Sequence, residues 1–350
     1  MHAILWSALN NLFVCLVLSL SFVCFLRYTA NEVVSMLEVL VTKSFTRTWP
    51  PSAQREWASK DLTKSEVPNK PSSPHFSEPQ TPIAIFNAFF SDDIIEFMVK
   101  MTILYAHRVD KCKHSFSTDA AEMRLFLAML LLSGYSVLPR RKMYRDNSDD
   151  VFNKAMSDAM SRNRFEEILS VFHLADNDYL TPCDVFAKVR PLYSIINDKY
   201  LEYYLNDEDL SIDECMLPYY RRHSSKHRIV GKPITMGYKM WVLAPSDGYV
   251  VQFEPYQAAN KTGATRSSAT SWGLLGELPV HTSYHIFIDN LFTSFHLLYH
   301  LLEHNVPATG VITSNKLGTC PIESSKSLEK KRRGYFDQTT DKNGSVTVVG

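Results

Sequence analysis

The sequence has no pair of cysteines at C-x-x-C spacing and no excess of charge of either sign. Its six cysteines are scattered along the 350 residues: Cys15, Cys24, Cys112, Cys183, Cys215 and Cys320. This spacing argues against a zinc knuckle and against a disulfide framework, and it favours a reducing compartment. Lysine plus arginine and aspartate plus glutamate both number 37. Any affinity for nucleic acid must therefore come from local patches and not from the field of the whole protein.

Charged residues are also missing from residues 3–26, and residues 12–26 are strongly apolar. A helix of about 20 mostly apolar residues can span a bilayer, so this segment predicts a possible membrane anchor. It lacks the positive amino-terminal region of a signal peptide. The first positive charges, Arg27, Lys43 and Arg47, follow it and would leave the rest of the chain in the cytosol. The alternatives are a buried helix and an extension unrelated to the folded protein behind it.

Composition divides the chain into five parts. Residues 1–42 contain the apolar segment, and residues 43–82 hold seven prolines among serine, lysine and glutamate, which predicts a poorly ordered linker. Residues 83–208 predict a helical domain, with Ser91 and Ser161 as N-caps. We expect its helices over residues 85–105, 118–132, 159–169 and 189–205. Residues 209–316 form the fourth part and residues 317–350 the fifth.

Residues 209–316 change from helical to strand periodicity. Strands are expected over residues 210–217, 234–244 and 249–255, and the last two are joined by a Ser246-Asp247-Gly248 turn. A strand ending at Asp289, a helix over 294–304 and a strand over 308–313 follow. Three meandering strands and then strand, helix and strand predict a mixed α/β sheet with helices packed on it. This order is typical of a ribonuclease H-like core, although not unique to one.

Asp213 and Asp289 stand at or near the ends of two of these strand patterns. If the strands are neighbours in one sheet, the two carboxylates lie side by side and can hold a divalent cation that prefers oxygen ligands. Such a metal site, with Asp213 and Asp289 as both the metal ligands and the catalytic residues, would support phosphoryl transfer. The alternative is structural, because aspartates at strand ends are common as turn formers and helix caps.

A basic segment follows Asp213 over residues 219–232. It contains two histidines and no acid, and its five cations are candidate DNA-binding residues: Arg221, Arg222, Lys226, Arg228 and Lys232. A phosphate backbone that enters a metal site needs counter-charges at its edge, and Tyr219 and Tyr220 could stack on an exposed base. A second basic cluster covers residues 330–333. Clusters of this kind are also found as solvated surface and as nuclear-import signals.

Several short motifs, in the same order along the chain, make residues 83–350 resemble the piggyBac-type transposases and the domesticated proteins derived from them. The matching stretches are residues 161–165, 187–191, 210–214, 231–233 with 237–239, 289–294 and 313–316. The resemblance implies a ribonuclease H-like fold that uses Mg²⁺ and three catalytic aspartates to cut and rejoin DNA. It also implies that the helical domain over residues 83–208 is of the DNA-binding or dimerisation type. The first two map onto Asp213 and Asp289.

The sequence departs from the family pattern in three ways. The third aspartate, which the family carries in a Gly-Val-Asp context on a later helix, has no counterpart here, so the core is expected to be truncated before its last catalytic helix. Residues 317–350 resemble the start of the family's insertion region, where Asp337 and Asp341 are more typical of turns. The cysteine-rich zinc module is missing, so no zinc site is expected, and the apolar amino terminus replaces a polar, acidic one.

These observations predict a transposase-derived protein that binds DNA weakly through its phosphates and is impaired as an enzyme. Any Mg²⁺ would be held weakly. The alternatives are a non-enzymatic scaffold of transposase ancestry and a membrane-anchored protein with the same ancestry. The resemblance also implies a nuclear location and a homodimer, whereas insertion of residues 3–26 would place the chain at a membrane.

Overall fold

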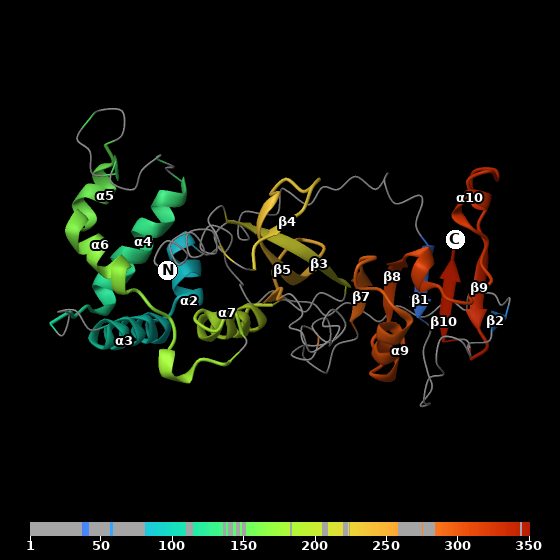
Figure 1. Cartoon of the computed structure of the whole chain (residues 1–350), viewed down its shortest axis with the longest axis horizontal. Coiled ribbons are helices and arrows are strands. Elements are labelled where there is room, and N and C mark those ends of the chain that lie inside the picture. The colour runs from blue at the N-terminus through green and yellow to red at the C-terminus, as the bar shows by residue number, and fades with distance from the viewer. Residues whose placement is uncertain are drawn as a thin grey trace.

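The computed structural model describes residues 37–41, 57–58, 81–109, 115–135, 138, 143–144, 148, 152–182, 184–204, 209–219, 223, 225–257, 275, 284–343 and 345–350. The helices formed by residues 82–202 gather toward one end of an elongated molecule, and a mixed sheet with two further α-helices among the described residues extends to the other (Figure 1). The α/β class with a mixed sheet, which the sequence predicts, is therefore confirmed.

The helical part contains six α-helices and a short 3-10 turn among the described residues. They are α2 (Pro82–Phe89), α3 (Asp92–Arg108), α4 (Ala120–Tyr135), α5 (Lys154–Ala159), α6 (Arg162–Val171), η4 (Asn177–Tyr179) and α7 (Arg190–Glu202). The single helix expected over 85–105 is two helices, because the chain leaves helical geometry at Phe90 and Ser91 before α3 begins. Ser91 and Ser161 occupy the N-cap positions of α3 and α6, as predicted.

One ion pair links the start of α6 to α4. Ser161 accepts a hydrogen bond from the backbone N–H of Arg164, which satisfies one of the free amides of the first helical turn. The Arg164 guanidinium donates to both carboxylate oxygens of Glu122 at 2.6 Å. Phe165, the next residue, is buried in the helical core. The 161–165 motif therefore fixes how α6 packs on α4.

The ten-stranded sheet has the order β2-β9-β10-β1-β8-β7-β3-β5-β4, with β6 also paired to β5. Its strands are β1 (Leu37–Val41), β2 (Trp57–Ala58), β3 (Asp209–Pro218), β4 (His227–Arg228), β5 (Met236–Pro245), β6 (Gln252–Pro255), β7 (His285–Ile288), β8 (Ala308–Ile312), β9 (Gln338–Asp341) and β10 (Val346–Val349). Strands β3, β7 and β8 are parallel neighbours, and the other pairs are antiparallel. The connection between β7 and β8 runs through α9 (Phe295–Glu303), as expected for a parallel pair.

The two faces of β3 and β5 contribute to different hydrophobic cores. Side chains on opposite faces alternate along a strand, so Leu217 and Met240 pack with the helices, whereas Ile212 and Trp241 face α9. Gly237 of β5 is required where the two strands cross closely, since a Cβ there would stand 1.8 Å from the carbonyl oxygen of Leu217. The helical part and the sheet thus share one of the two cores.

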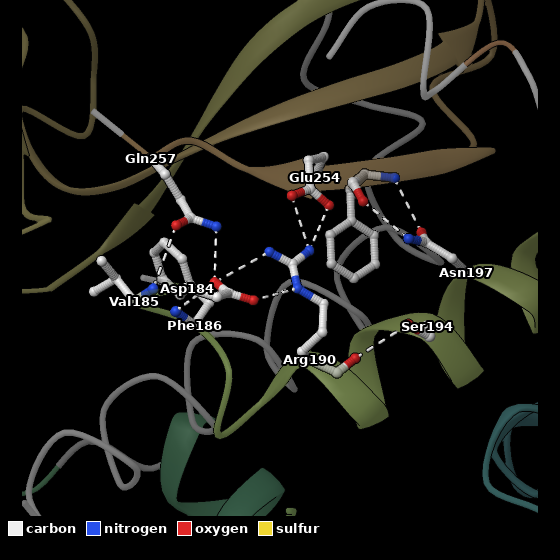
Figure 2. A network of polar contacts seen from close by, with 9 residues as sticks. Asp184, Val185, Phe186, Arg190, Ser194, Asn197, Glu254 and Gln257 are labelled. Carbon is white, nitrogen blue, oxygen red and sulfur yellow. Dashed lines mark hydrogen bonds and ion pairs between the residues drawn. The ribbon is translucent and has the colours of Figure 1, made fainter. Parts of the chain in front are cut away.

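Arg190, at the first position of α7, is the main polar link between the helices and the sheet (Figure 2). Its guanidinium donates to Asp184 at 2.9 Å and to both carboxylate oxygens of Glu254 on β6 at 2.8 and 2.6 Å. The Asn197 side chain exchanges two further bonds with the backbone of Phe253. Burial alone would raise the pKa of Asp184, but the Arg190 bonds outweigh it and the pKa is lowered.

The structure departs from three of the predicted domain boundaries. The linker predicted over 43–82 contributes β2, whose Trp57 packs edge-on to Phe295 at 5.6 Å and so buries a large apolar surface that local composition does not show. Residues 37–41 of the predicted amino-terminal segment form β1. Residues 317–350, expected as a separate region, include the short helix α10 (Ser325–Leu328) and add β9 and β10 to the same sheet.

The predicted membrane segment, residues 3–26, lies outside the described residues. Among the helices that the structure does describe, none is both long and apolar enough to cross a bilayer.

We expect Arg190→Ala to lower the free energy of unfolding by about 2–4 kcal/mol at pH 7, because it leaves two largely buried carboxylates without a counter-charge. The pKa of Asp184 is lowered in the folded state. The contribution of its charge to the free energy of unfolding is therefore fully present above the pKa of an unfolded aspartate, and it is lost as the pH falls through the pKa of the folded state. The deficit of the variant should therefore shrink below about pH 4. Urea titrations at pH 7 and at about pH 3 measure this.

Arg162→Ala, an exposed arginine of α6, is the matched control. An Arg190→Ala variant as stable as this control at pH 7 would show that the network does not hold the helices to the sheet.

Candidate functional site

Asp213, in the middle of β3, lies beside Asp289, which directly follows the carboxyl end of the parallel strand β7. The register pairs Ser211 with Phe287 and Ile212 with Ile288, and the two aspartates are the next residues of the chain after these partners. Parallel strands lie about 4.8 Å apart, and residues at the same level project from the same face. The predicted juxtaposition of these two carboxylates therefore follows from the register.

The electrostatics of Asp213 agree with this placement. Desolvation raises the pKa of the Asp213 carboxyl, although the residue itself reaches solvent, and the Asp289 carboxylate adds to the rise. The backbone N–H of Glu214, which donates to Asp213 at 2.6 Å, and the Lys232 ammonium oppose it. Like charges that disfavour joint ionisation are relieved by a cation between them. The pair therefore has a donor set that suits a hard divalent ion.

Lys316 fixes the turn that carries Asp289. Its ammonium donates to the backbone carbonyls of Asn290, Leu291 and Thr293 at 2.7, 3.1 and 3.0 Å. Burial lowers the pKa of Lys316, and the nearby Asp289 carboxylate opposes that shift. One lysine side chain thus holds the backbone of the turn and lies close enough to Asp289 to affect its charge balance.

Thr293 supports the same turn from inside the protein. Its fully buried hydroxyl donates to the carbonyl of Asp289 at 2.9 Å, and its amide bonds to the same carbonyl at 3.1 Å. Gly310 on β8 leaves room for this side chain, since a Cβ there would stand 2.5 Å from the Thr293 hydroxyl. The 289–294 motif is therefore a tightly packed turn that ends at Ser294, the N-cap of α9.

Glu214 points away from the aspartate pair, as expected for the next residue of a strand. Its carboxylate forms ion pairs with Lys239 and, at 3.6 Å, with Lys232. The Lys239 ammonium also stands 4.3 Å from the centre of the Trp241 ring. Glu214 is thus held by Lys239 on the opposite face and by Lys232 at the strand edge, and it does not complete the site.

The described part of the basic segment lies along β4, which pairs with β5 at Gly237, opposite Pro218 and not opposite Asp213. Lys226, Arg228 and Lys232 are described there, whereas Arg221 and Arg222 lie outside the described residues. Arg228 is exposed, and Lys232 lies close enough to influence the Asp213 charge. Tyr219, which was predicted to stack on a base, is instead fully buried against Tyr238 at 4.8 Å. That prediction is wrong because the residue continues the apolar face of β3.

The aspartates of the last part of the chain have structural roles. Asp337 accepts from the backbone N–H of Glu323 at 2.8 Å. Asp341 is buried and accepts from the amides of Ser345 and Val346, which makes it a turn residue as expected. Within the described ranges, no group of three or more His, Cys, Asp or Glu residues could hold a metal ion. The site consists of two carboxylates flanked by Lys316 and Lys232.

Comparison with known proteins shows the family of the chain. Residues 81–349 match the family model described as transposase IS4. The human piggyBac transposable element-derived proteins 3 and 2 are 37% and 35% identical over 325 and 309 residues, covering 87% and 84% of this chain. The chain belongs to the piggyBac-type transposase family. Transposases of this family generally depend on a divalent metal ion.

The piggyBac-type chain spans about half the length of these curated relatives, 54% and 51%. Its fold is similar to that of a piggyBac transposase solved by cryo-electron microscopy in a synaptic complex with hairpin DNA. The TM-score is 0.57 at 23% identity, over 77% of this chain and 60% of that one. At this identity the likeness shows the fold alone.

Reasoning from sequence missed the part played by Lys316 and Thr293. Both lie inside motifs that carry the family resemblance. Nothing in the sequence pattern shows that the side chain of a lysine 27 positions after Asp289 bonds to the backbone of the turn that follows Asp289. Such a contact depends on β8 lying beside β7, which is decided by the sheet.

We expect Lys316→Met to loosen the Asp289 turn, because three carbonyl groups lose their donor. Hydrogen exchange of the Phe292 and Thr293 amides, which bond to the Asp289 carbonyl, should accelerate by roughly tenfold. Lys326→Met, at an exposed lysine of α10, is the control and should leave exchange in this turn unchanged. Equal protection in both variants would mean that Lys316 does not hold the turn.

Proposed function

We propose that this chain is a DNA-binding protein with an incomplete ribonuclease H-like core, in which Asp213 and Asp289 are two of the ancestral metal-binding catalytic residues. The observation that carries the proposal is the register of β3 and β7, which brings two carboxylates to one sheet end. The order β6-β5-β3-β7-β8 also supports it, since three antiparallel strands are followed by a parallel strand, a helix and a second parallel strand.

The residues present fit a divalent cation such as Mg²⁺. Asp213 and Asp289 would hold it, and its charge would relieve the repulsion that contributes to the raised pKa of Asp213. When bound, an ion of this kind supplies charge stabilisation for phosphoryl transfer. Lys316 keeps the Asp289 backbone in place, and Lys232 offers a positive charge at the edge of the site.

DNA is the partner that the charges around the site favour. Lys226, Arg228 and Lys232 follow Asp213 on the β4–β5 hairpin, and Arg221 and Arg222 precede them in sequence. Lys232, which acts on the Asp213 charge, and Arg228 farther along the sheet on β4 would neutralise phosphates of a backbone that passes the pair. The solved structure with the similar fold is a transposase complex with hairpin DNA.

Efficient strand transfer by this chain alone is not part of the proposal. Two carboxylates leave a cation with few protein ligands, and a misplacement of about 1 Å can cost roughly 100-fold in rate. Glu214 cannot move into the site without breaking its pairs with Lys232 and Lys239. The alternative function is a non-enzymatic scaffold, which the well-packed family motifs of the helical part would equally serve.

The first test is DNA binding. A log–log plot of affinity against salt should have a slope of about −4 to −5 on duplex DNA if all five cations contact phosphates. Removing three of them, in Lys226→Ala with Arg228→Ala and Lys232→Ala, should reduce the slope by about 3. The charge-preserving set Lys226→Arg, Arg228→Lys and Lys232→Arg is the control and should keep it. An affinity for DNA that does not change with salt concentration would favour the alternative, a non-enzymatic scaffold.

The second test is metal binding and cleavage. Calorimetric titration with Mn²⁺ should show weak binding that is lost in Asp213→Asn and in Asp289→Asn and kept in Asp198→Asn, at an exposed aspartate of α7. Since the pKa of Asp213 is raised, protons compete with the ion, and binding should weaken as the pH falls through that value. Mn²⁺-dependent nicking of transposon-end DNA should be absent. Clear nicking that disappears with Asp213→Ala would contradict the proposed impairment.

A further inference from the structure

Seven residues near the end of the chain form an exposed segment that the proposed function does not use. Lys330–Phe336, which we call the basic–aromatic segment, joins four consecutive cations to Gly334, Tyr335 and Phe336. All seven residues are exposed, and Tyr335 and Phe336 expose 44% and 61% of their surface. Large aromatic side chains that serve only the fold usually bury most of their apolar surface. Two such rings exposed to water beside a run of positive charges therefore suggest a binding surface.

The backbone of this segment is turned and fixed. Lys331 and Tyr335 donate backbone hydrogen bonds to the carbonyls of Leu328 and Arg332 at 2.9 and 3.1 Å. Gly334 has a φ of +87°, a conformation that other residues rarely adopt, and it directs the chain into the two rings. Immediately afterwards, Asp337 exchanges two backbone bonds of 2.9 Å with Gly350. The rings are therefore presented from a fixed loop.

Side-chain contacts hold the Tyr335 ring, which stays partly exposed although Lys331 lies over one of its faces. The Tyr335 hydroxyl donates to Glu323 at 3.2 Å, and the Lys331 ammonium stands 3.7 Å from the same carboxylate oxygen. The same ammonium lies 5.0 Å from the centre of the Tyr335 ring. Phe336 has the larger exposed surface of the two. The segment thus combines positioned aromatic faces with free cations at Lys330, Arg332 and Arg333.

The basic–aromatic segment lies at the same end of the sheet as Asp213 and Asp289. Strand β10 runs in the direction of β3, β7 and β8, and β9 runs against it, so β9 begins where β10 ends. Val349 of β10 pairs with Gln338 of β9 and with Glu38 of β1, and Glu38 pairs in turn with Val311 of β8. Val311 is one residue past Gly310, the partner of Ile288. The start of β9 is therefore level with Asp289 across the sheet. Figure 1 shows α10, which precedes the segment, beyond the β10 and β9 end of the sheet.

The separation suits a nucleic acid that contacts both places. Five strand spacings separate β9 from β3 in the sheet order, which is about 24 Å. Successive phosphates of one duplex strand are about 3.4 Å apart along the axis, so roughly seven nucleotides cover that span. A strand whose phosphates lie at the aspartate pair could therefore reach the basic–aromatic segment within one turn of duplex.

We infer that the basic–aromatic segment binds unpaired nucleotides of a DNA strand that flanks the duplex held near Asp213. Its cations take the phosphates, and Tyr335 and Phe336 stack on the bases, a contact that every base can make. A run such as Lys330–Arg333 also suits a nuclear-import receptor. The turned backbone, the held Tyr335 ring and the exposed Phe336 ring favour the nucleic acid. The inference rests on the proposed DNA binding only for the duplex that lies near Asp213, and not for the unpaired nucleotides.

The experiment compares three fluorescent DNAs with the full chain: a blunt duplex, the same duplex with a single-stranded flank of about eight nucleotides, and the flank alone. We expect the flanked duplex to bind more tightly than the blunt one, and Tyr335→Ala with Phe336→Ala to remove that gain, about 10- to 100-fold in affinity. The blunt duplex should bind this variant as it binds the unaltered chain. Tyr335→Phe, which loses the bond to Glu323 but keeps the ring, should retain most of the gain.

Matched controls separate stacking from charge and from misfolding. Tyr179→Ala with Phe152→Ala removes two exposed aromatic residues of the helical part and should change nothing. Lys330→Ala with Arg332→Ala and Arg333→Ala should lower the salt slope for the single-stranded flank by about 2.

Equal binding of the flanked and blunt duplexes overturns the inference, and so does a gain in affinity that remains after both rings are removed. In either case a role of the four cations in nuclear import would be the remaining explanation of the segment. If the proposed function fails and this inference holds, the flank alone still binds through the rings while the blunt duplex does not.

Discussion

The pairing of β3 with its two neighbours is the constraint on which the rest of the structure depends. β3 runs antiparallel to β5 over nine registered positions and parallel to β7 over four. A shift of one residue in either register would turn every side chain of β3 to the other face. It would move Asp213 from the side of Asp289 and place Ile212 in solvent. The close crossing at Gly237 and the apolar cores on both faces hold the register.

Most of the motifs that identify the family hold the fold together and do not carry chemistry. Residues 161–165 supply a helix cap, an ion pair to Glu122 and a buried phenylalanine. Residues 187–191 supply Arg190, which joins α7 to β6. Such motifs can be retained by any descendant that must stay folded, whether or not it still cuts DNA. Family membership and catalytic competence are therefore separate questions for this chain.

The distribution of charge explains how a chain with no net charge can offer a nucleic acid several contacts. Acids of the helical part and of the junction are paired with arginines, as in Glu122 with Arg164 and Glu254 with Arg190. Cations near the sheet end are placed beside the two aspartates or exposed on the basic–aromatic segment. Because the acids are paired with arginines in the helical part while cations near the sheet end are exposed, the surface there has a local positive potential that the net charge of the chain does not reveal.

The sequence by itself determined most of the longer helices, the strands β3, β5, β6, β7 and β8, and the caps at Ser91 and Ser161. These features depend on local periodicity and turn chemistry, which neighbouring residues encode. Only the tertiary structure decided that Lys316 returns to the turn after Asp289, that Tyr219 is buried, and that residues 37–41, 57–58, 338–341 and 346–349 add strands to the same sheet. Each of those outcomes needs a partner far away in the chain, and the free energy of such a contact has no signature in the residues on either side of it.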